Sequence, residues 1–382
     1  PRRPARGLSI ADQQILEIAK AISLDASLLI MDEPTAALSG VEVERLFTVA
    51  RSLRDEGRAL VFISHRFDEV FDLCDTVTVM RDGEYVGTQR IAETSVDEIV
   101  SLMVGREVTD LFPKTPAEVG DVVLDVRDLS ATGRFHDVSF QVRAGEIVGL
   151  AGLVGAGRSE IARAVFGIDD YEAGTVSLGG APVRKRSPRE AIRAGMAFIP
   201  EDRRQQGLVT EASVARNVAA VIRRGLSRAG LLTTSMENDA VGPWAGRLEV
   251  KTSALDMRAA TMSGGNQQKV VIAKWLATEP RLLIIDEPTR GIDVGTKSEV
   301  HRLLSDLAGQ GMAILMISSE LPEVLGMADR VLVVCEGRLT ADMPREDATA
   351  EAVMHAATHR DGHAAGGAHH EPHAADKTEV SA

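Results

Sequence analysis

The chain has 382 residues, 44% hydrophobic and 3% aromatic, with a formal net charge of −13 at pH 7. This length is typical of about two domains, and the acidic balance argues against nucleic acid as the main partner, because binding a phosphate backbone needs a basic surface. No apolar run reaches the roughly 18 residues of a membrane span. The two cysteines, Cys74 and Cys335, fit buried thiols in a reducing cytosol.

Two short apolar runs early in the chain, Leu28 to Met31 and Leu60 to Ser64, are typical of buried parallel strands. A helix is predicted between them, over Val41 to Leu53. The first run delivers Asp32 and Glu33 together at its carboxyl end, where open α/β sheets bind their ligands.

The chemistry that this acid pair favours is cleavage of a phosphate bond. Asp32 can hold Mg²⁺ directly or through water, and Glu33 can orient or deprotonate the water that attacks a γ-phosphate. His65 follows the second run and can donate to a phosphate oxygen. The alternatives are a solvated turn for the acid pair and a structural role for the histidine.

A stretch of mixed charge with two prolines, Gly105 to Gly120, predicts a linker. Strands are predicted after it at Val122 to Val126 and Glu146 to Ala151, and a helix over Ser159 to Phe166. Before that helix, the chain has the G-x-x-x-x-G-K-[ST] spacing of a phosphate-binding loop. The predicted nucleotide-binding residues are Gly152, Gly155, Ala156, Gly157, Arg158, Ser159 and Glu160, with Ser159 also a candidate metal ligand.

The loop departs from its pattern at Arg158, which stands where lysine is usual. Arginine keeps the positive charge, but a planar guanidinium is not a compact ammonium, and we expect it to reach the β- and γ-phosphate oxygens less well. The substitution therefore predicts a weak or regulatory nucleotide site.

The motif SGGNQQ opens the next predicted helix with free N–H groups and no side chain in the way, which makes an anion site. The matching stretch near the N-terminus, Ser9-Ile10-Ala11-Asp12, places β-carbons and a negative charge where a phosphate would approach. We expect that end to bind phosphate poorly. The candidate nucleotide-binding residues of the motif are Ser263, Gly264, Gly265, Asn266 and Gln267.

The last third of the chain repeats the strand pattern at Leu282 to Ile285 and Ile314 to Ser318, around a helix predicted over Gly295 to Leu307. Asp286 and Glu287 end the first of these strands, so they are predicted as a metal ligand and a catalytic residue respectively. Ser319 follows its strand as His65 follows the earlier one, and its side chain is too short to reach a phosphate oxygen in the same way.

An ungapped offset relates the two parts of the chain: 286 − 32 = 254 residues from Asp32 to Asp286. The same offset carries Ser9 onto Ser263 and Gly83 onto Gly337. Chance would not keep register over such a span, so two copies of one domain are predicted. Only eight residues precede Ser9, and we therefore expect the phosphate loop of the first copy to lie before Pro1.

Beyond about Ala348 the chain becomes rich in alanine, glycine and histidine, which predicts a solvated tail that cannot build a core. Deleting Thr349 to Ala382 is then expected to leave stability nearly unchanged. Capture of a metal by His355, His359 and His363, spaced four residues apart, is the alternative.

These motifs, in this order, resemble the ATPases of ABC transporters over nearly all of residues 8–345. The segments AGLVGAGRSE, IPEDRRQQGLV, MSGGNQQKVVIAKWL and SSELPEVLGMADR are similar to the double-cassette ATPases of bacterial monosaccharide importers of the ribose, galactose, xylose and arabinose type. The resemblance implies an α/β P-loop NTPase fold, an ABC cassette in two tandem copies with the first incomplete. The implied division is a first cassette at 1–104, a linker at 105–120, a second cassette at 121–345 and a tail at 346–382.

The resemblance also implies an ATPase that uses ATP and Mg²⁺ at the cytoplasmic face of the membrane. Transmembrane permease subunits would be its direct partners, and a periplasmic or extracellular sugar-binding protein an indirect one. In that family two cassettes pack head to tail, and each ATP lies between one phosphate loop and the SGG motif of the other cassette. Arg158, Ser319, Ile10 to Asp12 and Glu201, where the family usually has glutamine, would then meet in a weak site. Glu33, His65 and Ser263 to Gly265 would belong to the working one.

Two alternatives from other classes are a soluble double-cassette factor acting in translation or repair, and a non-hydrolysing ATP-dependent dimerisation module. Factors of the first class usually keep both sites intact and carry a long charged linker, whereas this linker is short. The sugar cannot be read from this chain, because the pocket of the permease selects it.

Overall fold

The computed structural model describes residues 10–358, except 24–25, 36–37, 39, 65, 82, 97, 100–101, 103–111, 228–230, 249, 251 and 253. The chain divides into two compact units that interleave in sequence. One comprises Pro1–Pro116, Ile199–Thr278 and Pro288–Gly309, and the other Ala117–Phe198, Glu279–Glu287 and Gln310–Ala382.

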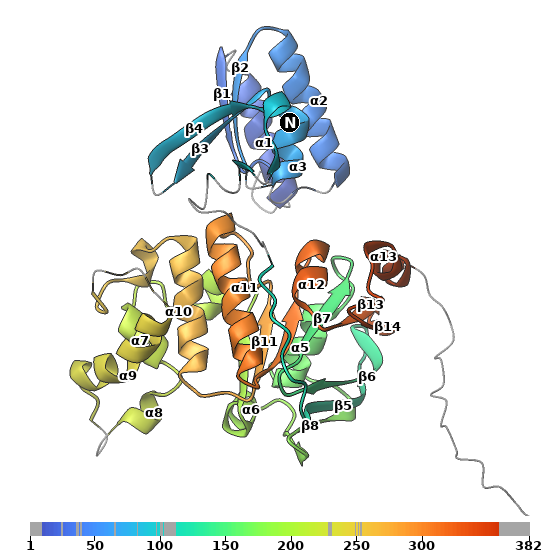
Figure 1. Ribbon diagram of the computed structural model, residues 1–382, viewed down its shortest axis with the longest axis vertical. Helices are drawn as coiled ribbons and strands as arrows, with labels where there is room; N and C mark the ends of the chain where they lie inside the picture. Colours follow the sequence, from blue (N-terminus) through green and yellow to red (C-terminus); the bar gives the residue numbers. More distant parts are fainter. Residues whose placement is uncertain are drawn as a thin grey trace, which may run out of the picture. The chain divides into compact units, whose positions relative to one another are not determined.

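The second unit is built on a six-stranded sheet with the order β10-β11-β12-β7-β13-β14. Figure 1 labels four of these strands, β7, β11, β13 and β14. Strands β11 and β7 both pair in parallel with β12, β7 also pairs in parallel with β13, and β14 returns antiparallel to β13. Strands β11 and β12 are buried at every residue, which is why they read as continuous apolar runs. The strands are β7 (Ile147–Gly152), β10 (Met196–Ile199), β11 (Leu282–Asp286), β12 (Ala313–Ile317), β13 (Arg330–Cys335) and β14 (Arg338–Pro344).

A smaller antiparallel sheet in the same unit has the order β6-β5-β8-β9. Its strands are β5 (Val122–Ala131), β6 (Phe135–Arg143), β8 (Ala173–Leu178) and β9 (Ala181–Pro182), and the helices of the unit are α5 (Arg158–Phe166), α6 (Pro188–Ala194), α12 (Leu321–Met327) and α13 (Ala350–Thr358).

The first unit contains two kinds of segment. Its helical segment comprises a π-helical turn η2 (Arg203–Gly207), α7 (Val214–Ala219), α8 (Arg223–Leu226), α9 (Thr234–Arg247), the 3-10 turn η3 (Ala259–Thr261), α10 (Gly264–Leu276) and α11 (Val294–Gly309). Its N-terminal segment comprises α1 (Ile10–Ser23), β1 (Leu28–Asp32), α2 (Gly40–Asp55), β2 (Ala59–Ile63), α3 (Phe67–Leu73), β3 (Thr76–Arg81), β4 (Glu84–Arg90) and the 3-10 turn η1 (Ile91–Glu93).

The elements of the N-terminal segment recur later in the chain with a constant offset. Adding 254 to both bounds of β1, α2, β2, α3, β3 and β4 gives the bounds of β11, α11, β12, α12, β13 and β14. The strand registers correspond as well: Leu28 pairs with Ala59 as Leu282 pairs with Ala313. The β-bulge at Val79 recurs in the same way at Val333. The predicted strands and helices are therefore confirmed to within one or two residues at most ends.

Among the described residues, the two sets of strands differ in what covers them. Strands β1 and β2 form a two-stranded sheet, whereas β7 pairs with both β12 and β13 in the second unit. Ile30 is accordingly 62% exposed, while its counterpart Ile284 is 0% exposed. Nearly the same apolar sequence is thus buried throughout in β11 and partly exposed in β1.

The predicted linker is described from Phe112 onward, and it contacts helix α11. The ring of Phe112 lies 5.2 Å from that of buried His301. The backbone N–H of Thr115 donates to the hydroxyl of buried Ser305 at 2.8 Å. This part of the linker is therefore fixed to the helix.

The expectation of an unpacked C-terminal tail is wrong for its first part. Residues Ala350–Thr358 form helix α13, and Val353 and Ala357 are buried in one cluster with Val331 and Val333 of β13. Thr340 also donates its hydroxyl hydrogen to the carbonyl of Ala356 at 2.8 Å. The alanine-rich composition gave no sign of this helix, because only two of its side chains, Val353 and Ala357, are buried. His359 and His363 lie outside the described residues.

We predict that Val353→Ala lowers the free energy of unfolding by about 1–3 kcal/mol, because it removes two buried methyl groups from that cluster. The matched control is Met354→Ala on the same helix, whose side chain is 44% exposed. It should change stability by less than about 0.5 kcal/mol. Urea titration measures both, and equal effects would contradict the docking of α13.

Candidate nucleotide site

The loop between β7 and α5 is shaped by glycines in backbone conformations that other residues rarely adopt. Gly152 has φ +149, and a Cβ there would lie 2.3 Å from the carbonyl oxygen of Val334. Gly157 is the N-cap of α5 with φ +103, and Gly155 has φ +82 with open space around it. The N–H groups at the start of α5 thus lie beside a loop free of side-chain obstruction, which is the geometry of an anion site.

The parallel strands bring an acid pair to the same edge of the sheet. Asp286 ends β11 and is 3% exposed, and its pKa is raised mainly by burial. The nearby hydroxyl of Ser159 lowers the pKa of this carboxyl in part, while Oδ1 is buried without a hydrogen-bond partner. A buried, unpaired carboxylate oxygen beside a hydroxyl is the donor set that Mg²⁺ prefers. The residues present therefore fit a bound Mg²⁺ ion.

Glu287 follows in a left-handed backbone conformation, with φ 52. Its N–H donates to the carbonyl of Ile317 at 2.8 Å, and its carboxylate accepts a hydrogen bond from the hydroxyl of Ser319 at 3.0 Å. Burial raises the pKa of Glu287 to about 7, and the Ser319 hydrogen bond opposes that rise. The sequence predicted that Ser319 and Glu287 follow two strands, but it did not predict this hydrogen bond between them.

Arg158 is buried and turned toward the end of β12. Its Nη1 donates to the carbonyl of Ser318 at 2.5 Å. Burial lowers its pKa, and the nearby charges of Glu287 and Asp286 oppose that effect. The guanidinium is therefore engaged by the protein itself at the place where a phosphate-loop lysine would point at a nucleotide.

The SGGNQQ motif starts helix α10 as predicted. Ser263 is the N-cap, and its hydroxyl accepts from the backbone N–H of Asn266 at 3.4 Å and from its side-chain amide at 3.0 Å. A Cβ at Gly265 would lie 2.6 Å from the side chain of Thr296. Gln267 is fully buried and donates to the carbonyl of Ala259 at 3.1 Å, which gives it a role in packing.

The remaining predicted residues lie elsewhere. Glu201 forms an ion pair with Arg290. Asp32 ends β1, and Glu33 has φ 44 with its N–H donating to Ile63 at 2.9 Å, the same turn as at Glu287. His65 and Ser9 lie outside the described residues.

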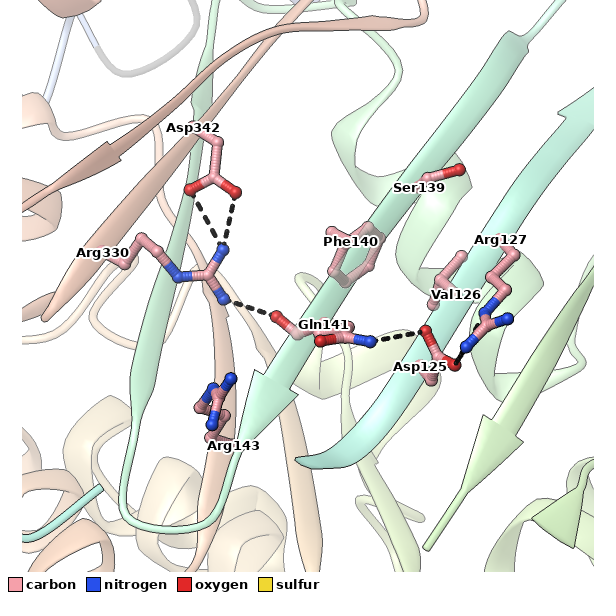
Figure 2. A pocket seen from close by; sticks show the side chains of 9 residues that line it. All are labelled: Asp125, Val126, Arg127, Ser139, Phe140, Gln141, Arg143, Arg330 and Asp342. Atoms are coloured by element: carbon pink, nitrogen blue, oxygen red, sulfur yellow. Dashed lines mark hydrogen bonds and ion pairs between the residues drawn. The ribbon is translucent and has the colours of Figure 1, made fainter. Parts of the chain in front are cut away.

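A separate polar cavity of 540 Å³ lies between β5, β6 and the β13–β14 pair (Figure 2). Arg330 dominates it, donating to Glu146 at 2.7 Å, to both carboxylate oxygens of Asp342 and to the carbonyl of Gln141. These groups satisfy one another, and the network joins the two sheets of the second unit.

Within the described ranges, no group of histidine, cysteine, aspartate and glutamate side chains forms a metal cluster. The same residues contain no helix long and apolar enough to cross a membrane. Cys335 is buried and Cys74 half-buried, and both are free thiols; burial raises the pKa of Cys74.

The phosphate loop, the acid pair after β11 and the motif at the start of α10 define an ATP-binding cassette. A model of the ABC transporter family matches residues 135–290. A solved structure, cbiO1 of Clostridium perfringens, part of the ABC transporter complex cbiONQ, superposes with TM-score 0.52 at 23% identity, over 61% of this chain and 93% of that one. A nucleotide-free ATP-binding cassette from an ABC transporter gives TM-score 0.51 at 20% identity, over 59% and 92%. These likenesses establish the fold.

Curated relatives are much closer in sequence. Ribose import ATP-binding protein RbsA 2 of Streptomyces avermitilis is 58% identical over 94% of this chain and 71% of its own length. RbsA 1 of Streptomyces coelicolor is 59% identical over the same shares, and RbsA of Rhodococcus jostii 57% identical over 94% and 71%. The chain belongs to this family of ABC transporter ATP-binding proteins, and it is an ABC-type ATPase.

The raised pKa of Glu287 predicts a pH dependence of stability. The fold favours the protonated carboxyl, so its stabilising contribution is complete below about pH 4.5 and is lost as the pH rises through about 7. The free energy of unfolding of Glu287→Gln, minus that of the wild type, should therefore increase from pH 5 to pH 8. Urea titrations at each pH measure it. Glu320→Gln, an exposed neighbour, is the control and should show no such trend; a flat difference for Glu287→Gln would contradict the burial of this charge.

Proposed function

We propose that this chain energises the uptake of ribose or a chemically similar monosaccharide by hydrolysing ATP at the cytoplasmic face of a membrane. The observation that carries the proposal is a phosphate loop facing Asp286 and Glu287 in a chain 58% identical to a ribose import ATP-binding protein. Permease subunits would be its direct partners and a sugar-binding protein outside the membrane an indirect one.

ATP and Mg²⁺ would be held by the loop residues Gly152 to Ser159 and by Asp286. The support is the pair formed by Ser159 and Asp286, together with the unpartnered Oδ1 of Asp286. Mg²⁺ would neutralise phosphate charge there. The protein's own part is to orient the phosphates on the N–H groups of α5 and to keep Glu287 close to them.

The Arg158 site is proposed to bind ATP without turning it over rapidly. Arg158 already donates to Ser318, and Glu287 is held by Ser319 in an environment that favours its neutral form. A neutral carboxyl is a poor general base. Rapid hydrolysis would instead depend on Glu33, in combination with His65 and the motif Ser263 to Gly265, on a nucleotide held by a lysine-bearing loop.

The sugar assignment is tested by assembling the subunit with its permease and binding protein in vesicles. Ribose outside should raise ATP hydrolysis several-fold, whereas other pentoses and hexoses should raise it less. Stimulation by a different sugar would correct the substrate. Stimulation by ribosomes or DNA in place of any sugar would favour a translation or repair factor.

We predict that Glu33→Gln in the assembled transporter lowers the hydrolysis rate by about 100-fold or more while sparing ATP binding, because it removes the group that activates water. Glu287→Gln is the matched change in the other repeat and should cost less than about threefold. Steady-state rates and nucleotide binding measure both. Equal losses would contradict the division into a fast and a slow site.

We predict that the 382-residue chain alone binds Mg-ATP weakly, through Gly152 to Ser159, and hydrolyses it barely above background. Arg158→Lys should not restore turnover, because Ser319 would still hold Glu287. Calorimetry measures the binding of Mg-ATP, and phosphate release measures its hydrolysis. Rapid hydrolysis by the isolated chain would show that the Arg158 site is catalytically competent.

A further inference from the structure

The π-helical turn that follows β10 is fixed by its own acidic residue. Asp202 is the N-cap of η2, and its carboxylate accepts from the backbone N–H groups of Arg204 at 2.9 Å and Gln205 at 3.0 Å. Arg203 lies between Asp202 and Arg204, so this cap fixes the backbone from which its side chain extends. π-Helical turns are rare and occur frequently at functional sites.

Arg203 uses the fork of its guanidinium on two consecutive backbone carbonyls. Nη1 donates to the carbonyl of Arg290 at 2.5 Å, and Nη2 to that of Gly291 at 2.8 Å. Both carbonyls belong to the segment that connects Glu287 with helix α11. Only arginine presents two parallel charged donors in a fixed plane, so this contact cannot be reproduced by lysine.

The same guanidinium lies against the first residue of α10. A Cβ at Gly264 would lie 2.7 Å from Nη2 of Arg203 and 2.9 Å from the carbonyl oxygen of Gly291. Glycine at 264 therefore lets three segments meet at one point. The Nε of Arg203 is buried without a hydrogen-bond partner, a cost that the fold accepts to keep the fork on its two carbonyls.

Two further cationic contacts connect η2 with α10. Nε of Arg204 donates to Oε1 of buried Gln267 at 3.3 Å, and Nζ of Lys274 donates to the carbonyl of Gly207. Gly264, Gln267 and Lys274 are three and seven residues apart, so they share one face of the helix. That face is tied to the turn along most of its length.

We propose that Arg203 is a positioning residue that makes three segments move as one body: the turn after Glu201, the Arg290–Gly291 backbone and the N-terminus of α10. The inference rests on the proposed function, in which Ser263 to Gly265 must present N–H groups to a phosphate. A misplacement of about 1 Å in such a group is enough to slow a reaction greatly. A displacement of the Glu201 turn would be passed directly to the SGG motif.

Hydrogen exchange on the 382-residue chain tests the clamp without any nucleotide. In Arg203→Met, which keeps the apolar stem and loses both donors, the amides of Asn266, Gln267 and Thr296, which donate to Ser263 and Asp293, should exchange about tenfold faster or more. Amides of β11 should keep their wild-type rates. Arg203→Lys should recover at most part of the protection. Arg224→Met, an exposed arginine in α8, is the control. Wild-type exchange in Arg203→Met would overturn the clamp.

Turnover in the assembled transporter tests what the clamp does. Arg203→Met should lower kcat about tenfold and leave the KM for ATP within about twofold, because the SGG motif is displaced while the phosphate loop is intact. Faster exchange with unchanged kcat would overturn the positioning role. A wild-type transporter that hydrolyses no ATP would overturn the proposed function instead, and the exchange result would still decide whether the clamp exists.

Discussion

Strand β12 pairs in parallel with β11 on one side and β7 on the other, and the candidate nucleotide site depends on these two sets of hydrogen bonds. Because all three strands run in one direction, their carboxyl ends meet at one edge of the sheet. The phosphate loop follows β7, the acid pair follows β11, and Ser318 and Ser319 follow β12. A slip of one residue in β11 would turn Asp286 away from Ser159. Register is therefore the first requirement of the chemistry.

The turn at the end of β11 is a unit that the chain uses twice. Glu33 and Glu287 both adopt positive φ, and both donate their N–H to the last residue of the next strand. A non-glycine residue in this conformation is strained, so its occurrence at both places indicates that the geometry of the glutamate is what the sequence preserves. The repeats differ in their surroundings: Ser319 holds Glu287, and β7 completes the sheet beside β12.

The backbone of the site could be predicted from the sequence because periodicity and glycine spacing are local signals, and because the internal repeat can be recognised from the residues alone. Strand ends, the phosphate loop and the cap Ser263 were all predicted from such signals and lie as expected. Helix α13 was missed because its composition resembles a tail, and its stability comes from packing onto β13. The packing role of Gln267 was missed for a related reason, since burial is a property of the whole fold.

Two arginines show where prediction from sequence stops. Arg158 donates to the carbonyl of Ser318, and Arg203 to those of Arg290 and Gly291. Every residue type has a backbone carbonyl, so no sequence motif can indicate which carbonyl an arginine will bind. The physical consequences are opposite. Arg203 lies outside the phosphate loop, and its contacts connect two backbone segments. Arg158 lies in the loop before α5, and in the proposed function a nucleotide would share its guanidinium with the Ser318 carbonyl. An arginine at this position therefore uses part of its guanidinium for a contact with the protein's own backbone.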